Sequence, residues 1–178
     1  MVAVDYGQKA NLTLPDGTKV WLNSATHLSY DAEYNKSDRK IYLDGEAYFE
    51  VAKNKDKRFI VCCNDLEIEA LGTTFDVKGY CDDHSVTTLL AEGSVKVSNK
   101  TDVTLLKPGE KVEYHKNKQT FSKSPISESN TTFTPYIRSS VVAISAKEDE
   151  LKINILFRQK SISRISEMGD LVNVCLFL

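Results

Sequence analysis

The first two thirds of the sequence predict an all-β fold, either a sandwich or a barrel. Three observations predict it: runs in which apolar and polar residues alternate, turn signals about every ten residues, and almost no helical periodicity before residue 125. Alternation with a period of two places the apolar side chains on one face of a strand, so each strand can bury that face. With 178 residues, the chain can form one domain with its own core and a small appendage.

The strands are expected in pairs, each pair joined by a turn rich in Gly, Pro, Asn or Asp. The pairs lie in residues 11–23, 39–51, 58–80, 85–99 and 102–117. Their turns are expected at Pro15-Asp16-Gly17, Asp44-Gly45, Asn64-Asp65, Glu92-Gly93 and Pro108-Gly109. Residues 27–34 follow the pattern less clearly, and residues 119–124 close the series. Gly72 falls inside an alternating run, which favours a bulge or a bend there.

The character of the sequence changes after residue 122. Residues 123–135 are rich in Ser, Thr, Asn and Pro and predict a linker. Residues 148–168 space their apolar side chains at helical intervals, with acidic residues first and basic residues later. Residues 170–178 are apolar and strand-like. The expected C-terminal segment, residues 136–178, is therefore a small α/β unit.

Composition argues against several classes of function. The net charge of −2 and the pI near 5.9 give no reason to expect nucleic acid or an anionic membrane as a partner. No apolar run approaches the roughly 18–20 residues of a membrane span, and the first residues lack the pattern of a signal peptide. The four cysteines contain no CxxC motif, and the three histidines lie far from any metal-ligand spacing. We expect no metal and no cofactor.

Two carboxylates beside aromatic residues, Glu46 and Glu50 around Tyr48 and Phe49, are the most suggestive enzyme-like pattern. In a strand, Glu46, Tyr48 and Glu50 share one face, and their neighbours, including Phe49, form an apolar face suited to packing. The two glutamates are then about 13 Å apart at their backbones. Glycosidases hold their paired carboxyl groups about 5–9.5 Å apart. The pattern therefore predicts a strand rather than a catalytic pair, and no other catalytic motif is present.

The only tryptophan, Trp21, has two interpretations. It alternates in phase with Lys19 and Asn23, so its ring could lie partly exposed as a platform for a ligand. It could equally cap one end of the core. The sequence leaves both interpretations open.

Six motifs in a fixed order resemble a known family. They are LPDGTKVWLNSATHLSY, RKIYLDGEAYFEVAKN, RFIV, LEIEALGTTFDVKGY, TTLLAEGSVKV and LLKPGEKVEY. Together they cover about residues 7–116, roughly two thirds of the chain, and resemble the periplasmic domain of FecR-type anti-sigma factors in the version common in Bacteroidetes.

The resemblance implies a jelly-roll-like antiparallel β-sandwich over residues 1–122. It also implies a signalling role without enzymatic activity. In such proteins a cytoplasmic region binds an extracytoplasmic-function sigma factor, and one helix crosses the inner membrane. The periplasmic part receives a signal from the signalling domain of a TonB-dependent outer-membrane transporter. This chain then corresponds to the periplasmic part alone, without the membrane helix.

The resemblance also assigns structural roles to particular residues. Those expected at turns, at the bulge or in the core are Gly17, Trp21, Gly45, Phe49, Gly72, Phe75, Gly93 and Gly109. The face formed by Glu46, Tyr48 and Glu50 is a candidate for partner contact. Residues 136–178 depart from the family pattern, because they lack the expected Trp-x-x-Gly segment, and are interpreted as a truncated or divergent version.

Two alternatives from other classes remain. One is a β-sandwich that binds or processes carbohydrate, and the other is a structural β-domain that assembles with itself.

Overall fold

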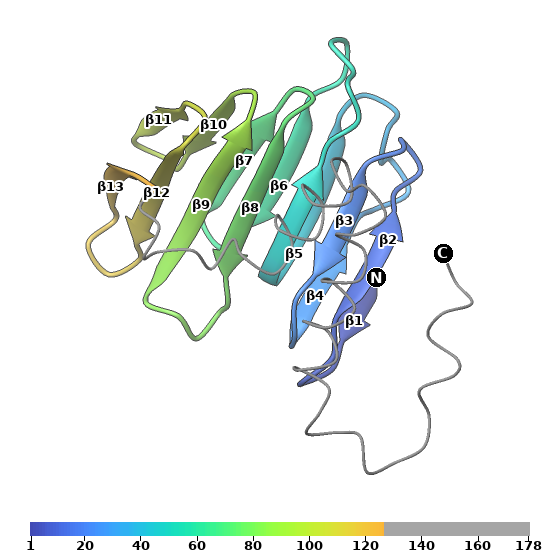
Figure 1. Ribbon diagram of the computed structural model, residues 1–178, viewed down its shortest axis with the longest axis horizontal. Coiled ribbons are helices and arrows are strands. Elements are labelled where there is room, and N and C mark those ends of the chain that lie inside the picture. The colour runs from blue at the N-terminus through green and yellow to red at the C-terminus, as the bar shows by residue number, and fades with distance from the viewer. Residues whose placement is uncertain (127–178) are drawn as a thin grey trace, which may run out of the picture. The chain divides into compact units, whose positions relative to one another are not determined.

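In the computed structural model, residues 1–126 can be described, and they form a mainly β structure, as the sequence predicts (Figure 1). The strands are β1 (Val2–Val4), β2 (Ala10–Thr13), β3 (Lys19–Leu22), β4 (Thr26–Ser29), β5 (Arg39–Glu50), β6 (Phe59–Cys63), β7 (Leu66–Ala70), β8 (Thr74–Gly79), β9 (Ser85–Glu92), β10 (Val95–Ser98), β11 (Val103–Leu106), β12 (Glu110–His115) and β13 (Thr120–Pro125). No helix occurs among these residues. In particular, none of them forms a helix long and apolar enough to cross a membrane.

The long strand β5 takes part in two sheets and joins them. Its first half, Arg39–Asp44, pairs with β4 and β6. We call this sheet A, which also contains β1, β7, β10 and β11. Its second half, Gly45–Glu50, pairs with β3 and β8. We call this sheet B, which also contains β2, β9, β12 and β13.

The strand pairings differ in one respect from the antiparallel sandwich expected. The pair β5–β6 is parallel, whereas the other pairings among the described strands are antiparallel. A parallel pair needs a crossover rather than a tight turn. Here β5 and β6 are connected by residues 51–58, which carry the chain back from the end of sheet B to the start of sheet A.

Gly45 does not end a strand, so the prediction of two strands around Asp44-Gly45 is wrong. Gly45 has a φ of +130° and sits where β5 passes from sheet A to sheet B. Only glycine adopts this backbone conformation readily. The residue therefore bends one continuous strand, and bends of this kind form the corners at which a strand changes sheets.

The core lies between the two sheets and is lined by aliphatic and aromatic side chains. In Figure 1, β6 and β7 lie behind β8 and β9. The ring of Phe49 stacks on Phe75 of sheet B, with centroids 5.1 Å apart, and meets the edge of Phe59 of sheet A at 5.7 Å. All three rings are fully buried. The face of β5 that carries Ala47 and Phe49 thus packs against the other sheet.

Four further glycines predicted at turns or at a bulge lie between strands. They are Gly17, Gly72, Gly93 and Gly109, with φ values from 71° to 92°. Gly72 connects β7 to β8, and the register shift of this region occurs instead at Thr74/Phe75. The irregularity that the sequence suggested near Gly72 is thus a turn followed by a shift in the next strand.

The last described strand, β13, runs to Pro125 and so includes the first residues of the segment predicted as a linker, 123–135. The remainder of that linker from residue 127 and the predicted C-terminal segment, residues 136–178, lie outside the described residues.

Candidate functional site

Arg39 is the largest fully buried side chain among the described residues. It is the first residue of β5 and shares the inward face of that strand with Ile41 and Leu43, which are buried in the core. A guanidinium group placed on a core face must find partners inside the protein, because burying an unpaired charge is very costly.

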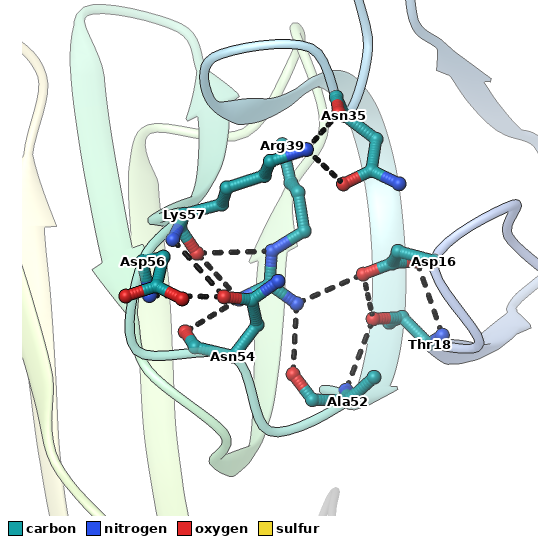
Figure 2. Close-up of polar contacts among 8 residues, drawn as sticks. All are labelled: Asp16, Thr18, Asn35, Arg39, Ala52, Asn54, Asp56 and Lys57. Atoms are coloured by element: carbon teal, nitrogen blue, oxygen red, sulfur yellow. Dashed lines mark hydrogen bonds and ion pairs between the residues drawn. The ribbon is translucent and has the colours of Figure 1, made fainter.

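Every N–H of the Arg39 guanidinium group has an acceptor (Figure 2). Nη1 donates to Asp16 Oδ2 at 2.9 Å and to the Ala52 carbonyl at 2.8 Å. Nε and Nη2 donate to the Lys57 carbonyl at 3.1 and 2.8 Å, and Nη2 also approaches the Asn54 carbonyl at 3.5 Å. A guanidinium group has five N–H donors. All of them are engaged, so Arg39 has none left for a ligand and its role is structural.

Asp16 completes this buried ion pair from the turn between β2 and β3. Its side chain is 4% exposed, and it accepts hydrogen bonds from the Thr18 hydroxyl at 2.7 Å and the Thr18 backbone N–H at 3.1 Å. Burial alone would raise the pKa of Asp16, but the hydrogen bonds from Thr18 and Arg39 together outweigh it and lower that pKa. The pair therefore ties the β2–β3 turn, the start of β5 and residues 52–57 together.

A second group of polar and aromatic side chains lies on the outer face of sheet B. We call it the polar face and define it by Trp21, Glu46, Tyr48 and Asp76. Trp21, Tyr48 and Asp76 stand directly opposite one another on β3, β5 and β8. Side chains directly opposite in neighbouring strands point to the same face, so these three form a row. None of the four belongs to the hydrophobic core.

Neighbouring side chains hold the polar face in place. The rings of Trp21 and Tyr48 are 5.4 Å apart at an angle of 58°. Asn23 Nδ2 donates to Glu46 Oε2 at 3.0 Å. Glu46, Tyr48 and Asp76 are only 6%, 4% and 4% exposed. Burial raises the pKa of the Tyr48 hydroxyl, which keeps it protonated.

Asp76 is the residue of the polar face with the least compensated charge. Its side chain is only 4% exposed, and the charges that act on it are those of Glu46 and Lys78. Burial, and secondarily the nearby charge of Glu46, raise the pKa of Asp76 well above its ordinary value, and Lys78 offsets this only in part.

The free energy of unfolding of the Asp76→Asn variant is expected to depend less on pH than that of the wild type. Because folding raises the pKa of Asp76, the folded state is favoured when the Asp76 carboxyl group is protonated. This contribution to stability is complete below the unfolded pKa, near 3.8, and is lost as pH rises through the folded pKa. The wild type should therefore lose more stability between about pH 4 and pH 7 than the variant does. Urea unfolding at several pH values measures the difference. Asp5→Asn, at an exposed position, is the control, and equal pH slopes for Asp76→Asn and wild type would contradict the expectation.

The structure brings together only some of the residues selected from the sequence. Glu46 and Tyr48 lie on the polar face with Trp21, whose ring contacts Tyr48 rather than the core. Glu50 is half-buried two residues further along the same face of β5. Phe49 and Phe75 point the other way, into the core.

Three important residues were missed by sequence reasoning. Arg39 carried a readable signal, because it continues the inward alternation of Ile41 and Leu43. Asp16 was treated only as a turn residue, and nothing local indicates its distant partner. Asp76 lies between the buried residues Phe75 and Val77, and its position opposite Tyr48 depends on a strand register that the sequence does not reveal.

Neither the Arg39–Asp16 ion pair nor the polar face has the composition of a catalytic or metal centre. Within residues 1–126, no group of three or more His, Cys, Asp or Glu side chains could hold a metal ion. The ion pair of Arg39 and Asp16 is saturated and closed, and Glu46, Tyr48 and Asp76 of the polar face are buried as well.

A family model and two solved structures both relate this chain to the same family of proteins. The family described as "FecR protein" matches residues 2–96. Two crystal structures of a candidate anti-sigma factor from Parabacteroides distasonis ATCC 8503, at 1.65 and 2.50 Å, superpose with a TM-score of 0.67 and 31% sequence identity. Each alignment covers 70% of this chain and 58% of the other, so the chain spans somewhat more than half of that relative's length. No curated protein matches the chain.

Proposed function

The chain belongs to the FecR family, which is regulatory rather than enzymatic, and we propose that it is the periplasmic sensor part of a transmembrane anti-sigma factor. In this role it relays the occupancy of a TonB-dependent outer-membrane transporter to an extracytoplasmic-function sigma factor. The sigma factor is bound by a cytoplasmic region outside these 178 residues. A single inner-membrane helix connects the two parts.

The observation that carries this proposal is the family match over residues 2–96, together with the likeness to a candidate anti-sigma factor at 31% identity. The site geometry is consistent with it. The buried ion pair stabilises the fold without offering a reactive group.

One edge of sheet B supports docking by strand addition. Among the described strands, β2 pairs only with β3, so no described strand pairs with its other edge. A shallow groove of about 230 Å³ lies over β2 and β3 and is lined by Asn11, Leu12, Thr13, Lys19, Val20 and Trp21. An extended segment of the transporter's signalling domain can add to such an edge through main-chain hydrogen bonds. The bound conformation would then be favoured and its effect passed toward the membrane.

Calorimetry with the full chain and the purified signalling domain of a TonB-dependent transporter tests this function. We expect saturable binding, with a plug domain that lacks the signalling domain as the negative control. A folded chain that binds no signalling domain from a transporter encoded beside it would count against the proposal.

A further inference from the structure

The strand β11 lies at an edge of sheet A. Among the described strands it pairs only with β10, and it lies at the same end of the two sheets as β13 (Figure 1). The turn before it is closed by a hydrogen bond from the Asn99 N–H to the Asp102 carbonyl at 3.0 Å. In an antiparallel pair, hydrogen-bonded and non-hydrogen-bonded positions alternate. The backbone groups of Thr104 therefore face β10, whereas those of Val103 and Leu105 face the outer edge of the sheet.

The side chains of Val103 and Leu105 make the same edge apolar. They are 63% and 61% exposed, and no other described strand carries two exposed large hydrophobic side chains. Both lie on the outer face of sheet A, since the next residue, Leu106, points into the core. An edge strand that exposes backbone groups and apolar side chains is a template for pairing with another chain.

Hydrogen bonds at both ends of β11 restrict the way in which another strand can pair with it. The Thr101 N–H donates to a side-chain oxygen within the β10–β11 turn at 2.9 Å, and the Lys107 N–H donates to Glu110 Oε2 at 2.7 Å. Pairing therefore has to use Val103 and Leu105. Two antiparallel copies of β11 use both residues fully when Val103 of one copy stands opposite Leu105 of the other. Each such pair exchanges backbone hydrogen bonds in both directions, and two-fold symmetry forms the pair twice.

The charges beside this edge complement one another in that arrangement. Lys123 of β13 stands opposite a core residue of β12, so its side chain points between the sheets. Its Nζ pairs with Glu110 and donates to the Leu105 carbonyl at 2.9 Å. Asp102, directly before Val103, falls on the inner side of the strand by alternation. Placing Val103 opposite Leu105 thus brings Lys123 of each copy beside Asp102 of the other.

We propose that β11 binds a second copy of this chain and forms a two-fold symmetric dimer, with Thr104 at the symmetry axis and sheet A continuous across both copies. Val103 and Leu105 of the two copies then cover one another on the outer face. The proposal is independent of the function given above. It leaves the β2 edge, in sheet B, available to a transporter.

Sedimentation equilibrium of the full chain over a range of concentrations tests the dimer. We expect the average mass to rise with concentration toward twice the 20.0 kDa of one chain. It should not rise further, because a two-fold interface is closed. A folded chain that stays monomeric up to about 1 mM, or one that grows beyond a dimer, overturns the proposal.

Charged substitutions locate the interface. Val103→Lys and Leu105→Lys are each expected to weaken dimerisation at least ten-fold, because each change occurs twice in the dimer and adds a charge to the paired edge. Leu71→Lys is the matched control, since Leu71 is 53% exposed between β7 and β8. It should dimerise like the wild type. Circular dichroism confirms that the variants are folded, which is expected because the replaced side chains are exposed.

A cysteine at the symmetry axis tests the register. Opposed residues of a non-hydrogen-bonded pair have Cα atoms about 4.5 Å apart, within the range of a disulfide. Thr104→Cys should therefore cross-link two copies when diamide is added, because diamide accepts the two protons and two electrons that the thiols release. Thr101→Cys, at a more exposed position in the same hairpin, should cross-link much more slowly. Both variants are made in a background with serine in place of Cys62, Cys81 and Cys175.

The outcomes distinguish this interface from the proposed function. Equal dimerisation of Leu105→Lys and Leu71→Lys shows that the copies meet elsewhere and overturns the proposal. Cross-linking of Thr104→Cys no faster than that of Thr101→Cys overturns the register. Binding of the transporter's signalling domain is expected to be the same for the wild type and Leu105→Lys, so the failure of either proposal leaves the other standing.

Discussion

Replacing Arg39 by alanine is expected to lower the free energy of unfolding by about 3–5 kcal/mol, the range for removing one partner of a buried ion pair. The substitution leaves the Asp16 carboxylate buried without its cation. It also removes the donors that satisfy the carbonyls of Ala52 and Lys57. Urea or guanidinium unfolding of the full chain, followed by circular dichroism, measures the loss.

Arg58 provides the control for the Arg39 experiment. It pairs with Asp38 and Glu69, but its side chain is 51% exposed, so Arg58→Ala should have little effect. An Arg39→Ala variant that is no less stable than Arg58→Ala would contradict the structural role of the buried pair. In the Asp16→Ala background, Arg39→Ala should cost less than it does alone, because no carboxylate is then left unpaired.

The loss of stability caused by Arg39→Ala should also be smaller at acidic pH. Folding lowers the pKa of Asp16, so the folded state is favoured when this carboxyl group is ionised. The contribution of the ion pair to stability is therefore complete above the unfolded pKa of 3.8 and is lost as pH falls through the folded pKa. The stability difference between the wild type and the variant should therefore narrow as the carboxylate becomes protonated.

Replacing Gly45 by alanine is expected to lower the free energy of unfolding by about 2–6 kcal/mol, from backbone strain and overpacking together. Gly45 has a φ of +130°, and an added Cβ would lie 2.7 Å from the Cα of Thr26. Because this clash involves backbone, trimming the Thr26 side chain cannot relieve it. Denaturant unfolding again measures the change.

Gly109→Ala separates the two contributions at Gly45. Gly109 also has a positive φ, +81°, but an added Cβ there meets nothing within 4 Å. Gly109→Ala should therefore lower the free energy of unfolding only through backbone strain, by about 1–3 kcal/mol. A Gly45→Ala variant as stable as Gly109→Ala would show that β5 can cross between the sheets without this close contact.

Much of the fold is local in origin, and the sequence predicts that part correctly. Apolar alternation identifies the inward face of β5 through Ala47 and Phe49, and the structure buries both. The same local reasoning fails at Gly45. A glycine that permits a turn also permits a strand to bend, and only the pairing partners on either side distinguish the two.

The candidate site could be predicted only in part. The shared face of Glu46 and Tyr48 follows from the period of a strand. The additions of Trp21 and Asp76 depend on the register of β3 and β8 against β5, and register is set by contacts between residues far apart in the chain.

By itself, the sequence determined the β class, the turns at Gly17, Gly93 and Gly109, and the family to which the chain belongs, because each of these is encoded in short, contiguous patterns. Only the tertiary structure decided that β5 links two sheets, that Arg39 is neutralised by Asp16 from another strand pair, and that Asp76 lies directly opposite Tyr48. The physical reason is distance along the chain. Alternation and turn chemistry act between neighbours, whereas charge pairing and strand register act between residues that folding alone brings together.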